Sequence, residues 1–133
     1  LIEVAALAAL EPTIGLKSLV SAHAIGRTAS VCVMLITRRA AREGLGADYI
    51  SKLSTSRGLA GIVAAVAVVI LVSGPKGFLL LGFAAPATII TWAWSHRSIG
   101  GVVGDSLGAI TQLSQTSVLI GAVTLNSGVC ACL

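Results

Sequence analysis

Residues 58–94 read GLAGIVAAVAVVILVSGPKGFLLLGFAAPATIITWAW, and this stretch decides the fold. Two apolar runs, 58–73 and 78–94, flank the turn SGPKG at 73–77. Each run is close to the ~17-residue lower limit for a helix that crosses a membrane. Val and Ile are frequent in the first run, but a bilayer requires internally satisfied backbone groups, which favours helices over strands. The stretch therefore predicts a membrane-crossing helical hairpin with a glycine- and proline-containing turn.

Three more apolar runs lie outside the hairpin. Residues 1–10 end at Glu11-Pro12, and proline disfavours helix at the residue before it. Residues 13–36 comprise 24 residues, which at about 1.5 Å per residue give about 36 Å, enough for a tilted crossing. Residues 106–125 are the weakest candidate because polar side chains interrupt them. The sequence predicts an all-α, polytopic helical membrane protein: a fragment of one partial domain with about four full membrane helices and a truncated first one near 1–10.

The composition supports this interpretation. Hydrophobic residues make up 56% of the 133 residues and charged residues 11%, with a mean hydropathy of +0.98. Soluble domains typically have about 45–50% apolar and about 25% charged residues. A chain this apolar has too few charges to cover a soluble surface, which excludes disorder and a nucleic-acid-binding domain. We therefore expect a lipid bilayer, and no nucleic acid, as its surroundings.

Most of the net charge of +4 lies in one predicted loop, residues 37–57. Its two acidic residues, Glu43 and Asp48, are outnumbered by five basic residues, which leaves +3: Arg38, Arg39, Arg42, Lys52 and Arg57. The positive-inside rule places this loop in the cytoplasm. The predicted loop 95–105 returns to the same side two crossings later. We therefore expect function on the cytoplasmic face.

The other predicted turns fall outside. They contain Glu11-Pro12 and Lys76, and Lys17 lies near the same end of its helix. A lysine in that position can extend its ammonium group to the interface while its stem stays in apolar surroundings.

The strongest local signal is GGVVGDSLGA at residues 100–109. Glycine lets a backbone approach a ligand closely, and a helix that begins at Ser106 would present free N–H groups to a phosphate. Asp105 would cap this helix or ligate Mg²⁺, which takes one or two carboxylates plus phosphate oxygens. A purely structural explanation of the same residues is the alternative. In that case they form a flexible loop and an N-cap, and the small residues serve helix packing.

The spacing after this segment predicts two helical faces. One face carries Asp105, Gly108, Gln112 and Gln115, and the other carries Leu107, Ile110 and Leu113.

His23 and Arg27 form a second constellation, four residues apart on one helical face and near the middle of the run 13–36. A charge at mid-membrane costs about 2.5–3.5 kcal/mol on insertion scales, so it normally faces a bundle interior or an aqueous cavity. Arginine suits bidentate phosphate contacts. An arginine paired with a buried acid that holds two helices together is the alternative.

Further basic residues lie at the predicted cytoplasmic face. Arg97 follows Trp92 and Trp94, which are typical of an interfacial aromatic belt. Arg42 belongs to the basic loop, which could bind anionic headgroups or a polyphosphate substrate. Both arginines are phosphate candidates, and both also fit an ordinary positive-inside pattern.

The order of these motifs resembles one family. A helix with HAIGR at 23–27 precedes REGLG at 42–46, the hairpin, and GGVVGDSLGA leading into QLS at 112–114. This order is similar to the C-terminal half of cobalamin synthases (adenosylcobinamide-GDP ribazoletransferases), and the resemblance extends to about Ile120. Many members carry Glu after the Leu-Ser pair, where this chain has Gln115.

The resemblance implies a multi-pass, Mg²⁺-dependent enzyme of a bacterial or archaeal cytoplasmic (inner) membrane, with its active face in the cytoplasm. Such enzymes transfer the phosphocobinamide group of adenosylcobinamide-GDP to α-ribazole or its 5′-phosphate and release GMP, late in cobalamin biosynthesis. The family's aspartate-rich segment belongs to an N-terminal half that these residues do not contain. That half is thus an expected partner, and residues 1–133 alone are expected to be inactive.

The candidates above match what this chemistry requires, namely positioning and neutralisation of phosphate charge. Catalytic roles are expected for His23, Arg27 and Asp105, with Asp105 also a metal ligand. Substrate-binding roles are expected for Gly100, Gly101, Gly104, Gly108, Arg42 and Arg97.

Three other functions fit parts of the pattern. A CDP-alcohol phosphatidyltransferase uses similar chemistry but is recognised by a spaced Asp motif that these residues lack. A transporter subunit would use His23 and Arg27 as a midplane site and requires polar counterparts in neighbouring helices. A non-catalytic assembly subunit would explain the small residues of the hairpin.

Overall fold

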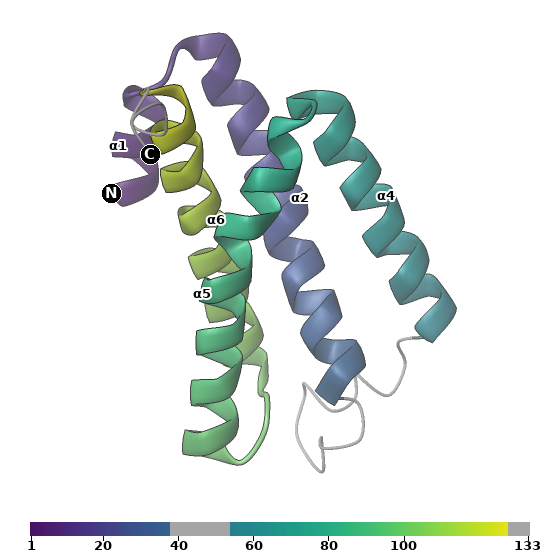
Figure 1. The fold of residues 1–133 in the computed structure, drawn as a ribbon. Coiled ribbons are helices and arrows are strands. Elements are labelled where there is room, and N and C mark those ends of the chain that lie inside the picture. Colours follow the sequence, from purple (N-terminus) through teal and green to yellow (C-terminus); the bar gives the residue numbers. More distant parts are fainter. Residues whose placement is uncertain (38–53, 128–133) are drawn as a thin grey trace.

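The computed structural model describes residues 1–37 and 54–127, and helices account for nearly all of them (Figure 1). The described residues contain no strand, which confirms the predicted all-α class. Five helices follow one another: α1 (Ile2–Ala8), α2 (Pro12–Thr37), α4 (Thr55–Ser73), α5 (Lys76–Ile99) and α6 (Gly104–Asn126).

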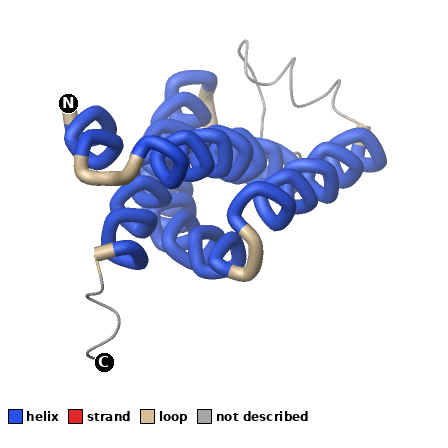
Figure 2. Tube along the Cα trace, turned by 90° about the horizontal axis from the view of Figure 1, so that it is seen from above, coloured by secondary structure: helices blue, strands red, loops and turns tan. Residues whose placement is uncertain are grey.

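The four long helices alternate in direction, so that the bundle has two distinct ends (Figure 1). The C-terminal end of α2, the start of α4 and the α5–α6 connection lie at one end. The α4–α5 turn lies at the other, beside the start of α2 and the end of α6. We call these the connection end and the turn end. Helix α6 packs on both α2 and α5, whereas α4 packs mainly on α2 (Figure 2).

Two groups of buried apolar side chains hold the bundle together. The first fills the turn end and the middle, with Ile25, Val69 and Leu119 among its members. The second lies toward the connection end and contains Val33, Val102, Leu107 and Ile110. Ile110 is fully buried, as its predicted face requires, but Leu113 is 49% exposed. The predicted apolar face of α6 is thus wrong at Leu113.

Three of the described helices, α2, α4 and α5, are long and apolar enough to cross a membrane. Helix α6 has 23 residues but is not among them, so the expected fourth span is not confirmed. Polar side chains make this helix less apolar than the other three. Among them, Ser106, Ser114 and Gln115 are buried against neighbouring helices. Helix α4 is the opposite case, because only 11% of its most apolar stretch is buried, which leaves most of its apolar surface uncovered by the described residues.

Helix α5 extends beyond the apolar run that predicted it. It continues to Ile99 with Pro86 inside it, and so includes His96 and Arg97. It ends at Gly100, whose φ of +74° favours glycine. Helix α6 begins at Gly104, two residues before the predicted start. The predicted loop 95–105 is therefore wrong in extent, because apolarity marks where a helix meets lipid rather than where it ends.

Candidate functional site

Helices α2 and α6 cross closely at Gly26. Gly26 makes this close crossing possible, because a Cβ there would lie 2.6 Å from Gln115 Cγ and 2.9 Å from the Thr111 carbonyl oxygen. One turn further along α2, the Ser30 hydroxyl hydrogen-bonds to Thr111 Oγ1 and lies 3.0 Å from the Leu107 carbonyl oxygen. The absence of a side chain at Gly26 therefore sets the register of the two helices.

This register brings His23 and Gln115 together. His23 Nδ1 lies 3.0 Å from Gln115 Nε2, which indicates that the amide donates to an unprotonated Nδ1. Gln115 is 7% exposed, so it does not share the exposed face of Asp105, Gly108 and Gln112, and the predicted grouping is wrong for this residue. Spacing within one helix missed the contact, because it depends on how α2 and α6 are aligned.

Arg27 follows His23 on the same side of α2, and both residues are exposed. Among the described residues they do not face the interior of the bundle, because small residues such as Ala22 and Gly26 occupy the buried side of α2. The expectation that they face a bundle interior or an aqueous cavity stays a prediction. Within residues 1–37 and 54–127, Arg27 has neither a hydrogen bond nor an ion pair. Its guanidinium group is available to a ligand or to another polypeptide segment.

The α5–α6 connection is held from inside by one serine. Ser95 is fully buried, and its Oγ lies 2.8 Å from the Gly101 carbonyl oxygen and 2.7 Å from Ser106 Oγ. These hydrogen bonds tie the last turn of α5 to the first turn of α6. The short segment between Gly100 and Gly104 is consequently fixed at its inner side.

The outer side of this segment is open. A Cβ at Gly101, Gly104 or Gly108 would meet no atom within 4 Å. Packing within the described residues therefore gives no reason for glycine at these three positions, whereas Gly100 is explained by its left-handed backbone. A ligand or partner that approaches the backbone closely would explain them.

Asp105 is exposed in the first turn of α6. The N-cap is Val103, so the expected capping role of Asp105 is wrong. The described residues contain no group of three or more His, Cys, Asp or Glu side chains that could hold a metal ion. Asp105 can supply one carboxylate to Mg²⁺, and substrate phosphates would have to supply further ligands.

Glu3 is a polar residue of this region that the sequence analysis missed. Its Oε1 accepts hydrogen bonds from Gln112 Nε2 at 2.7 Å and from Thr116 Oγ1 at 3.0 Å. The contact fixes α1 against α6. A lone carboxylate inside the apolar run 1–10 was the available signal.

Of the two other predicted phosphate-binding arginines, the structure describes Arg97, which lies apart from these contacts. Arg97 is exposed in the last turn of α5, where His96 stacks on Trp92 with ring centroids 6.2 Å apart. Arg97 thus lies at the same end of the bundle as the open glycines. Arg42 lies outside the described residues.

Comparison of the chain with known protein families gives a match. A family model described as cobalamin-5-phosphate synthase matches residues 1–123. The chain belongs to that family. The match covers α1, α2, α4 and α5 and most of α6, and thus every candidate residue named above.

Several curated relatives of this member of the cobalamin synthase family have the same name. An adenosylcobinamide-GDP ribazoletransferase from Stutzerimonas stutzeri is 33% identical over 104 residues, which is 78% of this chain and 42% of the relative. Proteins of the same name from Klebsiella pneumoniae and Clostridium acetobutylicum are 32% and 27% identical, over 84% of this chain. The chain spans less than half the length of these relatives, between 42% and 45%. No solved structure matches the chain.

Proposed function

We propose that the chain forms part of an adenosylcobinamide-GDP ribazoletransferase. In this reaction a hydroxyl oxygen of α-ribazole, or of its 5′-phosphate, attacks the phosphorus atom that carries cobinamide. A new phosphodiester bond forms, the pyrophosphate P–O bond breaks, and GMP leaves. The hydroxyl proton is lost to a base or to water. The family match and the shared name of the relatives support this assignment.

The observation that carries the proposal is Arg27 beside the α2–α6 crossing, which has no hydrogen bond or ion pair with any described residue. His23 contacts Gln115 on one side of it, and Ser30 contacts Thr111 on the other, so Arg27 lies level with the middle of α6. Over this length the exposed residues of α6 include Gly108 and Gln112. An exposed arginine suits a pyrophosphate, because its planar guanidinium group binds two phosphate oxygens together.

Mg²⁺ belongs to the same proposal. Mg²⁺ would neutralise charge on the pyrophosphate, and Asp105 is the described carboxylate nearest in sequence to the open glycines. This chain's own contribution is to bind and orient phosphate oxygens through Arg27, and through Arg97 at the connection end. We also propose that this end faces the cytoplasm of a bacterial or archaeal cell, because the residues between α2 and α4 include four basic and two acidic side chains, and Arg57 adds another positive charge at the start of α4.

The test uses membrane vesicles that contain the complete gene product. Adenosylcobinamide-GDP and α-ribazole are added with Mg²⁺, and released GMP is quantified. We expect GMP release that requires both substrates, and a decrease in kcat/KM of at least tenfold for Arg27→Gln, about 1.4 kcal/mol of transition-state stabilisation. Arg57→Gln, an exposed arginine at the start of α4, is the matched control. Absence of GMP release from the unmodified protein would refute the function. Full activity of Arg27→Gln would refute only the role of Arg27.

A further inference from the structure

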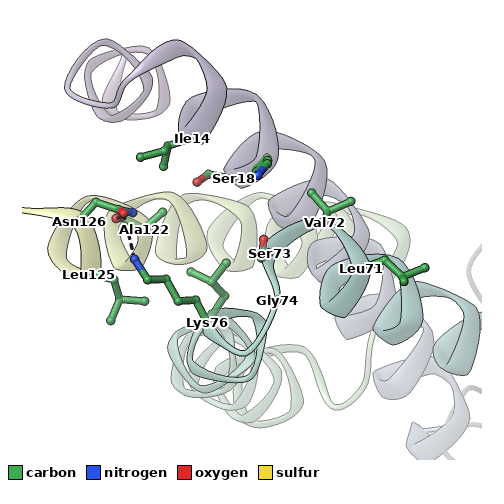
Figure 3. A pocket seen from close by; sticks show the side chains of 12 residues that line it. Ile14, Ser18, Leu71, Val72, Ser73, Gly74, Lys76, Ala122, Leu125 and Asn126 are labelled. Carbon is green, nitrogen blue, oxygen red and sulfur yellow. Dashed lines mark hydrogen bonds between the residues drawn. The ribbon is translucent and has the colours of Figure 1, made fainter.

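A cavity of about 450 Å³ lies at the turn end (Figure 3). This end of the bundle is opposite to the α5–α6 connection (Figure 1). The cavity is bordered by the first turns of α2, the end of α4, the start of α5 and the end of α6. Its volume lies within the range of about 300–1,000 Å³ that is usual for ligand pockets. None of the residues assigned to the proposed reaction lines it.

The charges around this cavity are unbalanced. Lys17 and Lys76 both line it, and no described carboxylate does. Lys76 Nζ donates a hydrogen bond to the neutral Asn126 Oδ1 at 3.2 Å (Figure 3). Within the described parts of the chain, Lys17 has no hydrogen bond or ion pair. Two like charges repel each other across one cavity, and an anion between them would convert this repulsion into attraction.

A buried hydroxyl group in the cavity wall also lacks a partner. Ser18 is only 4% exposed and lines the cavity, yet its Oγ forms no hydrogen bond with any described residue (Figure 3). The neighbouring serines are satisfied, because Ser21 Oγ and Ser73 Oγ lie 2.7 Å apart. The Ser18 hydroxyl borders the cavity, so it can donate a hydrogen bond to a ligand oxygen there.

The surroundings of the cavity indicate where such a ligand comes from. Leu16, Leu71 and Phe78 are 65%, 84% and 61% exposed. Leu71 lines the cavity, and the other two lie within two residues of a lining residue. They belong to α2, α4 and α5, the helices that are apolar enough to cross a membrane. Basic groups at the end of such helices lie at the depth of lipid headgroups, with apolar surface beside them for acyl chains.

We propose that the turn-end cavity binds a phosphate group, held by Lys17, Lys76 and Ser18, and that an anionic phospholipid headgroup supplies it. Lys17 and Lys76 contribute the charge, and Ser18 donates a hydrogen bond to a phosphate oxygen. The proposal does not depend on the transferase activity, because it concerns the opposite end of the bundle.

The experiment measures lipid binding by the complete protein in detergent. Phosphatidylglycerol is titrated and bound lipid is counted by native mass spectrometry, with phosphatidylcholine and inorganic phosphate as parallel arms. We expect phosphatidylglycerol to bind at least tenfold more tightly than phosphatidylcholine. The double variant Lys17→Gln, Lys76→Gln should lose this preference, while Lys17→Arg, Lys76→Arg retains it. Arg57→Gln removes one exposed cation at the connection end and should leave binding unchanged.

Each outcome decides the proposal. Equal binding of the two lipids, or unchanged phosphatidylglycerol binding by the Gln double variant, would overturn it. Binding of inorganic phosphate that requires both lysines, without a preference for phosphatidylglycerol, would support the phosphate site and assign its ligand to solution instead of lipid. The Arg double variant keeps both positive charges and therefore controls for misfolding. If both double variants lose binding although their circular dichroism spectra are native, the charge argument is overturned.

Discussion

Two sets of glycines in this bundle have opposite surroundings. Gly26 in α2 and Gly121 in α6 are enclosed, and a Cβ at Gly121 would lie 2.5 Å from Phe83 Cγ. Gly104 and Gly108 in the first turns of α6 face open space. A glycine inside a helix costs roughly 0.5–1 kcal/mol relative to alanine. Close helix packing compensates for this cost in the first set, but no contact among the described residues does so in the second.

This difference predicts that the enclosed glycines are needed for folding and that the open glycines are needed for ligand binding. Where packing explains glycine, alanine should harm stability. Where packing does not explain it, alanine should leave the fold intact and interfere only with what approaches from outside. Gly61 in α4 and Gly82 in α5 are open as well, so an open glycine by itself shows only that packing among the described residues does not require it. The variants below test whether the open glycines of the connection end serve a ligand.

The largest effect on stability is expected for Gly26→Ala. The Thr111 carbonyl oxygen, 2.9 Å from the new Cβ, belongs to the backbone, so α2 and α6 would have to separate. We expect a loss of about 1–3 kcal/mol in the free energy of unfolding, typical of overpacking. SDS titration of the detergent-solubilised protein, followed by circular dichroism, measures it. Unchanged stability would show that the crossing is looser than described.

Ser95→Ala should have the next largest effect. It removes the hydroxyl that binds the Gly101 carbonyl oxygen and Ser106 Oγ, and leaves buried polar atoms without partners. We expect a loss of about 1–2 kcal/mol by the same titration. Ser98→Ala is the matched control, because Ser98 is exposed in the same turn of α5. Equal stability of the two variants would contradict the role of Ser95.

Gly108→Ala tests the second set, the glycines that face open space. The added methyl group meets no described atom, so we expect stability to be equal or higher by about 0.5–1 kcal/mol, since alanine is the better helix former. Release of GMP should fall at least tenfold if substrate approaches the backbone here. Ala109→Ser changes an exposed neighbour and should keep full activity. Full activity of Gly108→Ala would remove the functional reason for this glycine.

The helices were predictable because long apolar runs separated by breakers leave few alternatives. The α5–α6 connection was not, since His96 and Arg97 are polar but helical, and a hydropathy pattern assigns polar residues to loops. The two sets of glycines could not be told apart in advance. In the sequence, Gly26 is one residue of the motif HAIGR at 23–27. Its packing against Thr111 depends on the alignment of two helices whose contacting residues lie more than eighty positions apart.

The contact of His23 with Gln115 followed from that alignment and gives the smallest expected effect. Single variants His23→Ala and Gln115→Ala and their double variant form a thermodynamic cycle. We expect a coupling energy of about 0.5–1 kcal/mol, as for one neutral hydrogen bond at a partly exposed site. His96→Ala with Gln115→Ala is the control cycle and should show no coupling, because His96 contacts Trp92 instead. A coupling near zero would mean that Gly26 and the hydrogen bonds of Ser30 fix the crossing without His23, and that His23 is free to contact a ligand beside Arg27.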